Sequence, residues 1–408
     1  MSVSESNESD PATSAAHDLE WALARLEELV RLESPSLDRA ASLRITDSLA
    51  AGFEAVGGRV TAHDFDGGRH LVVDVPGAAS PDAASPATGS PATAQPHDTP
   101  GDAPLLLVGH SDTVWASGTL EQTLPWSRDA TTVHGPGVFD MKSGLVVIEA
   151  ALARVPQQRR RPVRVLVTAD EEVGSPDGKT LIPRVLQGVR GALGFESPHP
   201  DGALKVGRRG STRVMVRVQG VEAHAALDPE RGVSAITELL AQLGDAQSLV
   251  ARVSDTGPEV LLNIGTISGG TRANVTAGSA RAELGLRFQD STSERKVLSA
   301  LVGATAHDRR ATVTTDVLSQ RTAWAPDEGD RALLAEVADA ARSLGHDVSG
   351  RPAAGASDLN QVGASGVPAV DGLGPRGGGA HALTEHVDIA SFAERIDLLA
   401  ALLTVSDD

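Results

Sequence analysis

Three consecutive acids, Asp170, Glu171 and Glu172, follow the apolar run VRVLVTA at residues 163–169. Like charges packed side by side raise one another's pKa unless a cation offsets them. Either this predicted strand ends in solvent, or a positive group belongs beside its last residues. The choice depends on whether other residues of the ligand type end neighbouring strands.

Other candidate metal ligands lie in comparable positions. "GHSDTV" contains His110 and Asp112, whose side chains share one face of a strand, so one could bind a metal while the other fixes the imidazole tautomer. Asp140 lies in the Gly-rich turn "HGPGVFDMKSG", which could also be an ordinary helix start capped by Asp. Glu196 in "LGFES" and His381 in "GGGAHALTEH" have equally ordinary alternatives as polar loop residues.

Taken together, these residues fit a pair of zinc ions. Zinc binds nitrogen and oxygen ligands at roughly 2.0 to 2.2 Å, and one carboxylate can bridge two ions about 3.5 to 4 Å apart. A cation pair would offset the acids at 170–172, and Glu171 would stay free to take a proton from water. The candidate ligands are His110, Asp140, Glu172, Glu196 and His381.

Composition excludes several other classes of function. The chain has no Cys, so it has no disulfide framework, no thiolate nucleophile and no Cys-ligated zinc. The formal net charge of -18 and the shortness of the basic run "RRRPVR" at 159–164 argue against a nucleic-acid partner. The sequence has no stretch of 18 consecutive apolar residues, so no membrane span is expected. Its polar start lacks the features of a signal peptide. We therefore expect a cytoplasmic protein.

Two segments are expected to lie outside the folded core. Residues 1–17 are polar and acidic, which is typical of a disordered tail. Residues 78–103 consist almost entirely of Ala, Ser, Pro, Thr, Gly and Asp, so they cannot bury enough apolar surface to offset their ordering entropy. This second segment is predicted to be a flexible surface insertion.

The first two hundred residues predict an α/β fold. "LEWALARLEELVRL" at 19–32 has helical spacing, and "LLLVGH", "VRVLVTAD" and "GALGFES" alternate as strands with a helix near 145–154. Each of the three strands ends on His or an acid. Loops beyond the carboxyl ends of strands are where an open α/β sheet usually builds its site.

The pattern changes from Ser211 onward. Alternating strands and two helical runs follow in the order βαββαβ, which predicts a small two-layer inserted domain. The last ninety residues then return to a helix, a Gly-rich loop, the strand "VPAVDGLG" and a final helix.

The ordered motifs "HSDTV", "GPGVFDMKSG", "ADEEVGS", "GFES" and "GAHALTEHVDI" resemble the M20 family of zinc exopeptidases and amidohydrolases, and are most similar to its glutamate carboxypeptidase branch. The resemblance covers nearly everything from about Leu19 onward except 78–103. It implies a zinc-exopeptidase catalytic domain, with a mixed central sheet flanked by helices, over 18–209 and 319–408. It also implies an inserted lid and dimerisation domain over 210–318, and hence a homodimer.

The resemblance assigns a role to each residue of the centre. One zinc would be held by His110, Asp140 and Glu196, and the other by Asp140, Glu172 and His381, with Co²⁺ or Mn²⁺ as possible substitutes. Asp112 would orient His110, and Glu171 would be the general base and later the acid that protonates the leaving amine. The peptide bond after the bridging Asp140 is expected to be cis.

The lid segment "GVEAHAALDPERGVSA" contains His224, which by resemblance would polarise the scissile carbonyl, often in the partner subunit's site; taken alone, it would be an ordinary surface residue. Asn274 and Arg287 match substrate-holding positions. Arg321 matches an arginine that clamps the substrate's free carboxylate, a task for which a bidentate guanidinium is suited. Lys205 falls out of register with the lysine of the glutamate-preferring branch, so the side-chain preference stays open.

The predicted function is hydrolysis of an amide bond beside a free α-carboxylate of a small peptide or N-acyl amino acid, as in a glutamate carboxypeptidase. The nearest alternative is an N-acyl amino acid deacylase of the acetylornithine or succinyl-diaminopimelate type, which would use the same metal chemistry. A remote alternative is a non-catalytic, peptide-binding dimer. Metal content would separate this last class, because a silent binder need not retain zinc.

Overall fold

The computed structural model describes residues 11–78 and 103–405. Residues 1–10 of the predicted tail and 79–102 of the predicted insertion lie outside the described residues. The prediction of a disordered tail is wrong for residues 11–17, which form the start of helix α1, Pro11–Arg31. Contacts divide the chain into two compact units, which are described separately: a first unit of Met1–Val206, Glu328–Arg351 and Val367–Asp408, and a second unit of Gly207–Asp327 and Pro352–Gly366. The second unit includes residues 319–327 and 352–366, which the sequence analysis grouped with the catalytic domain.

A six-stranded mixed sheet forms the centre of the first unit, which confirms the α/β prediction. Its order is β1-β2-β6-β3-β7-β14, in which β6, β3, β7 and β14 are parallel and β1 and β2 are antiparallel neighbours. All side chains of β3 are buried, as expected of a parallel strand covered on both faces. The bounds are β1 Arg59–Phe65, β2 Gly68–Val75, β3 Leu105–His110, β6 Val163–Thr168, β7 Gly191–Gly194 and β14 Ala369–Val370.

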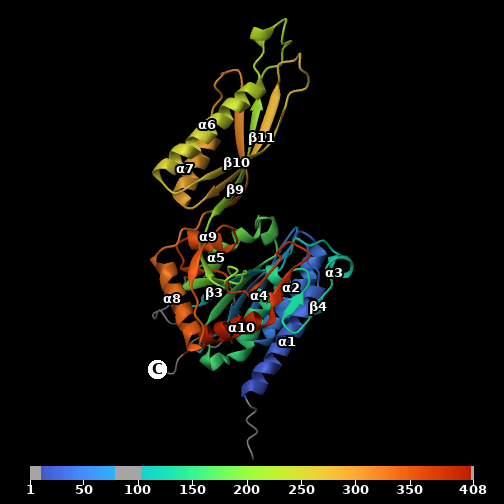
Figure 1. The fold of residues 1–408 in the computed structure, drawn as a ribbon, viewed down its shortest axis with the longest axis vertical. Helices are drawn as coiled ribbons and strands as arrows, with labels where there is room; N and C mark the ends of the chain where they lie inside the picture. Colours follow the sequence, from blue (N-terminus) through green and yellow to red (C-terminus); the bar gives the residue numbers. More distant parts are fainter. Residues whose placement is uncertain (1–10, 79–102, 406–408) are drawn as a thin grey trace, which may run out of the picture. The chain divides into compact units, whose positions relative to one another are not determined.

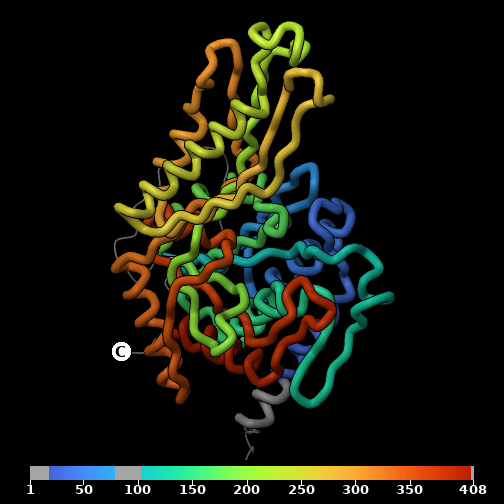
Figure 2. Tube along the Cα trace, turned by 45° about the horizontal axis from the view of Figure 1, so that its top comes forward, coloured from blue at the N-terminus to red at the C-terminus, as the bar shows by residue number. Residues whose placement is uncertain are grey.

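Helices cover this sheet, and α4 lies deepest among them. Residues 143–152 of α4 are buried on every side, and the helix packs against α1, α10 and β3 (Figure 1). Figure 2 shows the red C-terminal chain returning beside the green segment that contains α4. The bounds are α1 Pro11–Arg31, α2 Arg39–Ala55, α4 Ser143–Arg154, α8 Glu328–Ser343 and α10 Ile389–Leu403.

A second, smaller sheet of the first unit has the order β15-β16-β5-β4. Its strands are short and come from distant parts of the chain, since β16 pairs with β5 so that His386 lies opposite His134. This pairing brings the residues before α10 next to the turn that precedes α4. The bounds are β4 Ser127–Arg128, β5 Thr132–His134, β15 Gly377–Gly378 and β16 His386–Asp388.

The second unit has the predicted βαββαβ order and a four-stranded antiparallel sheet, β10-β11-β9-β12. Alternate residues of β9, Val214, Val216 and Val218, pack with Leu239 and Leu243 of α6, which leaves the other face of the sheet uncovered by this helix. The bounds are β9 Gly210–Gln219, α6 Ala235–Thr256, β10 Leu261–Gly269, β11 Ser279–Phe288, α7 Ser291–Val302 and β12 Thr312–Arg321.

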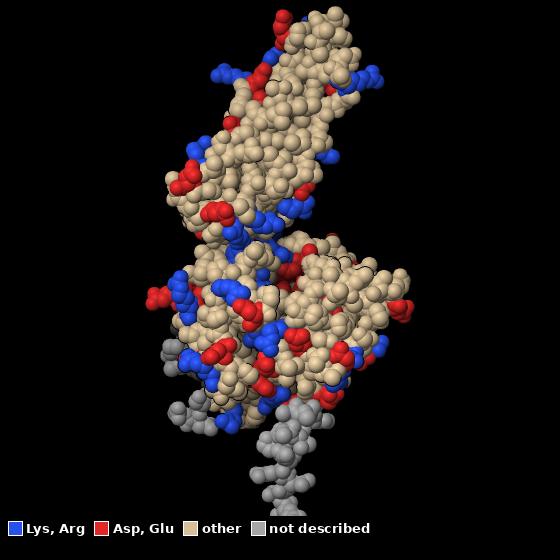
Figure 3. Space-filling model, viewed as in Figure 1, with Lys and Arg blue, Asp and Glu red and all other residues tan. Residues whose placement is uncertain are grey.

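Acidic and basic side chains are interspersed over much of the face in view in Figure 3. Among the described residues, no helix has the length and apolar content to cross a membrane. The cytoplasmic location stays a prediction.

The remaining described elements are short. They are α3 Thr119–Gln122, η1 Val138–Lys142, η2 Gln157–Arg159, η3 Glu171–Val173, η4 Gly178–Thr180, α5 Ile182–Val185, β8 Leu204–Arg208, η5 Pro229–Arg231, β13 Gly350–Ala353 and α9 Leu359–Ala364.

Candidate metal centre and active site

Three neighbouring parallel strands deliver candidate ligands to one edge of the first unit's sheet. β3 ends at His110, β6 is followed by Glu171 and Glu172, and β7 is followed by Glu196. Because β6, β3 and β7 are adjacent and parallel, their carboxyl ends meet at the same edge. The position of the acid triplet is therefore a consequence of the strand order.

Asp140 enters this edge from the turn that leads into α4. The turn is not helical at Asp140 and Met141, and the peptide bond between them is cis, as expected from the resemblance. Gly144, at the start of α4, allows a close approach to the end of β7, because a Cβ there would lie 2.2 Å from the Phe195 carbonyl oxygen. The segments that carry Asp140 and Glu196 are thereby packed together.

His381 reaches the same place from the connection between β15 and β16. It adopts a left-handed backbone conformation with φ of 60°, and Gly379 before it has φ of 74°. A Cβ on Gly379 would lie 2.6 Å from the Thr384 backbone, so a glycine is required for this tight connection. The β5–β16 pairing sets the His381 connection beside the Asp140 turn.

Asp140 lies between the two imidazoles. Its Oδ1 is 3.2 Å from His110 Nε2 and its Oδ2 is 3.3 Å from His381 Nε2. Glu196 Oε1 lies 3.4 Å from His110 Nε2, and Glu172 Oε2 lies 3.2 Å from His381 Nε2. The five candidate ligands thus form two groups that share Asp140.

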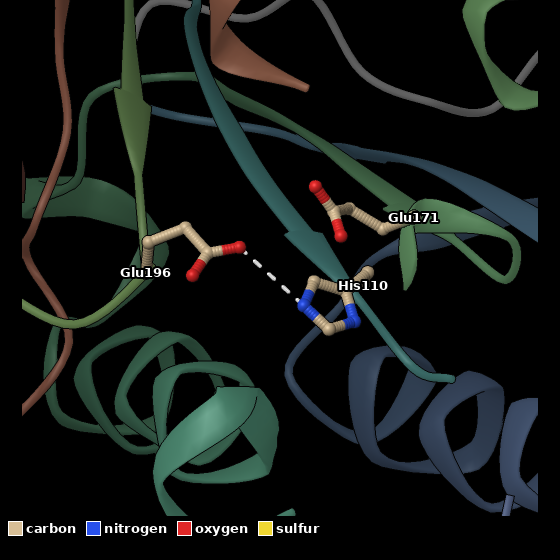
Figure 4. Close-up of side chains that lie close together, drawn as sticks. All are labelled: His110, Glu171 and Glu196. Carbon is tan, nitrogen blue, oxygen red and sulfur yellow. Dashed lines mark ion pairs between the residues drawn. The ribbon is translucent and has the colours of Figure 1, made fainter. Parts of the chain in front are cut away.

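Glu171 belongs to the same cluster. Potential ligand atoms of His110, Glu171 and Glu196 lie within 4.8 Å of one another, as do those of His110, Asp140 and Glu172. In Figure 4, Glu171 and Glu196 extend from different segments toward His110. These groupings mix the two predicted ligand sets and place Glu171, the proposed base, among the ligands.

The acids and imidazoles shift each other's ionisation. Burial favours a neutral imidazole at His110, but hydrogen bonds to Asp112, Asp140 and Glu196 raise its pKa well above the usual value. The hydrogen bond to Asp140 is the largest effect that raises the pKa of His381 to about 9. Without a metal ion, the neighbouring acids thus favour the protonated form of both imidazoles.

The two acids beside His381 respond differently. Burial opposes the charge of Asp140, yet hydrogen bonds to His110 and His381 hold its pKa well below the usual range. Burial raises the pKa of Glu172 to about 7, and the charge of Asp140 acts in the same direction. Glu172 is therefore an acid whose charge the surrounding protein does not fully compensate.

Asp112 makes contacts beyond the predicted one to His110. The His110 Nδ1 contacts the Asp112 backbone oxygen at 2.9 Å and its Oδ1 at 3.4 Å. The Asp112 carboxylate also accepts hydrogen bonds from the backbone N–H groups of Glu171 and Glu172, at 3.1 and 3.2 Å, and from Ser36 Oγ at 2.7 Å. The Asp112 carboxylate therefore contacts the backbone of Glu171 and Glu172 as well as the imidazole.

Two observations show that divalent cations fit these residues. Among the described residues, no Lys or Arg forms an ion pair with Asp140, Glu172 or Glu196. Glu172 Oε1 is buried and has no hydrogen-bond partner in the described part of the chain. A carboxylate oxygen in this state is a free ligand atom, and imidazole and carboxylate groups are suitable ligands for zinc.

A cavity of about 300 Å³ adjoins the candidate ligands. Its walls are Phe139, residues 197–200 and residues 376–380, which neighbour Asp140, Glu196 and His381 in sequence. Residues 374–379, "GPRGGG", form a glycine-rich loop, and part of this loop thus lines the cavity beside the candidate ligands.

His224 and Asn274 lie together in the second unit, because Ala225 N–H donates to the Asn274 carbonyl oxygen at 3.1 Å. The His224 Nδ1 accepts hydrogen bonds from the backbone N–H groups of Ala226 and Leu227, at 3.2 and 3.1 Å. Since Nδ1 is the acceptor, the ring hydrogen of the neutral tautomer is on Nε2. His224, which is exposed, therefore presents a hydrogen-bond donor.

Arg287 and Arg321 form a second pair in the same unit. Arg287 of β11 and Arg321 of β12 both lie opposite Ser211 of β9. Residues directly opposite each other in antiparallel strands point to the same face, so both guanidinium groups rise from the face that α6 leaves uncovered. The sequence could not show this pairing because it depends on strand register.

Glu385 is a functional candidate that the sequence analysis did not select. It is fully buried and contacts the turn that carries Asp140. The available sequence signal was an acid four residues after His381 in "HALTEH", which is too common a pattern to interpret alone.

Sequence comparisons identify relatives with two kinds of activity. The chain is 28% identical over 317 residues to carboxypeptidase G2 of Pseudomonas sp. (strain RS-16), with 74% of each chain covered. It is 30% identical over 322 residues to succinyl-diaminopimelate desuccinylase of Gluconacetobacter diazotrophicus, with 73% of this chain and 80% of the relative covered.

Solved structures share the fold at lower identity. The aminopeptidase PepT of Bacillus cereus superposes with a TM-score of 0.69 at 20% identity, covering 94% of this chain and 98% of that one. The M20 family metallo-carboxypeptidase Sso-CP2 of Sulfolobus solfataricus gives 0.63 at 13% identity, covering 93% and 98%. The sequence pattern of peptidase family M20/M25/M40 matches residues 106–405. The chain therefore belongs to peptidase family M20/M25/M40.

Proposed function

We propose that this protein is a two-zinc hydrolase that cleaves an amide bond beside a free α-carboxylate, as a glutamate carboxypeptidase-like exopeptidase. The observation that carries the proposal is the cluster of acids at the sheet edge, which holds two imidazoles and, within the described part of the chain, no guanidinium or ammonium partner for Asp140, Glu172 or Glu196. Glu171 lies within this cluster and is nearly buried, which suits a proton-transfer group.

The chain's own residues would divide the chemistry between them. Bound zinc would polarise the scissile carbonyl and lower the pKa of the attacking water. Glu171 takes a proton from that water and returns it to the leaving nitrogen as the tetrahedral intermediate collapses. His224 donates its Nε2–H to the oxygen of the scissile carbonyl, where negative charge develops. Arg287 and Arg321 hold the substrate's carboxylate, and Asn274 supplies a further polar contact.

The geometry of the second unit supports a site shared by two subunits. Arg287 and Arg321 align with Ser211 at one end of β9, whereas His224 follows Gln219 at the other end. At about 3.3 Å per residue, these ends are on the order of 25 Å apart, which is longer than a dipeptide. Within one chain, therefore, His224 and the arginine pair cannot hold the same small substrate. We propose a homodimer in which His224 and Asn274 act in the partner's site.

A complementation experiment tests the shared site. His224→Ala and Glu171→Ala each abolish turnover when assayed alone. If the residues act from different subunits, mixing the two variants under conditions that exchange subunits restores roughly a quarter of wild-type activity, because half the dimers are mixed and each has one intact site. A mixture that stays inactive although its subunits exchange would contradict the shared site.

The alternative substrate class is an N-acyl amino acid of the acetylornithine or succinyl-diaminopimelate type. The succinyl-diaminopimelate desuccinylase supports it, since it matches with identity and coverage similar to those of carboxypeptidase G2. An acetylornithine deacetylase of Myxococcus xanthus is 33% identical over 44% of this chain. The deciding experiment is a hydrolysis panel of the zinc-loaded protein with peptidyl and N-acyl glutamates, acetylornithine and succinyl-diaminopimelate, each with a chelator control. Chelator-sensitive release of C-terminal glutamate supports the carboxypeptidase proposal. Turnover confined to the acylated diamino acids favours the deacylase.

A further inference from the structure

Glu385 lies beside the candidate metal centre without belonging to the ligand set. Its side chain is fully buried, and four N–H groups donate hydrogen bonds to its carboxylate. Oε2 accepts from the indole Nε1 of Trp115 at 2.6 Å and from the backbone of Gly137 at 3.1 Å. Oε1 accepts from the backbones of Phe139 and Asp140 at 2.9 and 3.1 Å.

Three of these donors belong to the turn that carries Asp140. The turn departs from helical geometry at Asp140 and Met141, so its amides cannot all be satisfied by a regular helical ladder. A carboxylate provides acceptors on both oxygens and no donor, and therefore suits a site that presents only N–H groups. Glu385 replaces the hydrogen bonds that the backbone of this turn lacks.

The same carboxylate is attached to the segment that carries His381. Two consecutive turns connect the residues, because Ala382 N–H donates to the Gly379 carbonyl oxygen at 2.8 Å and Glu385 N–H donates to the Ala382 carbonyl oxygen at 3.0 Å. Glu385 thus connects the His381 segment to the Asp140 turn, which lies more than two hundred residues earlier in the chain. The imidazole and carboxylate on these two segments are 3.3 Å apart.

We propose that Glu385 is a positioning residue that holds Asp140 and His381 in the geometry needed to bind metal. Its bonds to Gly137, Phe139 and Asp140 fix the turn, and Trp115 fixes the orientation of its carboxylate. The inference rests on the proposed metal function of these residues. It assigns Glu385 an effect on metal affinity beyond its contribution to stability, since loss of partners that orient metal ligands typically weakens binding by about 10- to 100-fold.

The test compares Glu385→Gln with a matched control, Glu149→Gln. Glu149 is also a buried carboxylate of the first unit, and it accepts two hydrogen bonds from Arg25 at 2.7 and 3.0 Å, with no contact to the candidate ligands. The amide of Glu385→Gln keeps the shape but directs an NH₂ group against N–H donors. Metal-free wild type and both variants are titrated with zinc against a competing chelator, and their thermal unfolding is recorded without metal.

We expect Glu385→Gln to bind zinc about 10- to 100-fold more weakly than wild type and Glu149→Gln to bind within about twofold of wild type, even where both lose thermal stability. Cobalt-loaded Glu385→Gln should also show an altered visible absorption spectrum. Equal affinity and an unchanged spectrum in Glu385→Gln would overturn the proposal. So would a loss of affinity in both variants that follows their loss of stability.

A milder variant covers the case in which Glu385→Gln does not fold. Trp115→Phe removes one donor and leaves the three backbone bonds, so we expect a folded protein with an affinity loss of a few-fold and a shifted cobalt spectrum. No change in either would overturn the positioning role. If the wild type itself binds no zinc, the proposed function is wrong. If the wild type binds zinc and the variants bind it with the same affinity, only the proposed role of Glu385 is wrong.

Discussion

Carboxylates have opposite surroundings in the two sheets of this protein. On the uncovered face of the second unit's sheet, Glu283 pairs with Arg213 at 2.6 Å and Asp316 pairs with Arg217. At the edge of the first unit's sheet, the only ion-pair partners of Asp140, Glu172 and Glu196 among residues 11–78 and 103–405 are imidazoles. The difference shows which acids are compensated within the chain. Among the described residues, the acids of the first unit's cluster thus lack the permanently charged guanidinium partners that the acids of the second unit's sheet have.

The largest expected effect is kinetic. Glu171→Gln removes the proposed base but none of the proposed ligands, so it should lower kcat by about 100- to 10,000-fold while zinc content stays at the wild-type level. Steady-state hydrolysis and metal analysis of the same preparation measure both quantities. Wild-type turnover in Glu171→Gln would contradict the assignment of the base.

His381→Ala should affect binding rather than proton transfer. It removes one imidazole of the proposed ligand set, so zinc affinity should fall by more than about tenfold, and activity should fall with it at low zinc. A competitive zinc titration measures the affinity. If His381→Ala retains wild-type affinity, the second metal does not use this imidazole.

Glu172→Gln sharpens the comparison, because it should have opposite effects on metal-free and metal-loaded protein. Burial and the neighbouring Asp140 disfavour the Glu172 charge, so its removal should stabilise the metal-free protein on the order of 1 kcal/mol near neutral pH. Zinc affinity should decrease. Urea unfolding with chelator present measures the first effect, and destabilisation there would mean that the acids are already compensated.

Glu283→Gln is the matching substitution in the second unit. It breaks a partly exposed pair with Arg213, so the free energy of unfolding should decrease by no more than about 1 kcal/mol. Zinc affinity should stay at the wild-type value. A large loss of stability would show that the paired acids are not merely surface groups.

The smallest effect is a pH dependence at an exposed pair of the first unit. Arg351 hydrogen bonds lower the pKa of Asp201 from 3.8 to about 2. A depressed pKa contributes stability above the unfolded value, and this contribution is lost as the pH falls through about 2. Asp201→Asn should therefore lower the unfolding midpoint by about a degree or less at neutral pH, with the difference from wild type disappearing below about pH 2. A difference that persists in acid would point to another cause.

Local patterns predicted the parts of the structure that depend on neighbouring residues. The strands that end at His110, before the acids at 170–172 and before Glu196 are present, and so is the βαββαβ order of the second unit. Each of these depends on apolar periodicity within one segment. Helix α1 begins at Pro11, whereas the sequence predicted a start at Leu19. The predicted start was too late because the apolar periodicity on which it depended begins only at Leu19.

Contacts between distant segments were not predictable in the same way. "HSD" indicated a local partner for Asp112, but its hydrogen bonds to the Glu171 and Glu172 amides depend on the adjacency of β3 and β6. Glu385 reaches the Asp140 turn only because β16 pairs with β5. A single sequence contains no signal for either contact, since both depend on how the strands are ordered.

The length of β9 has a consequence for how the protein would behave in dilute solution. If the two ends of this strand serve different active sites, a lone subunit can be folded and fully metal-loaded and still lack a complete set of substrate contacts. Turnover per subunit would then depend on protein concentration, falling as dilution separates the pair and returning when the solution is concentrated.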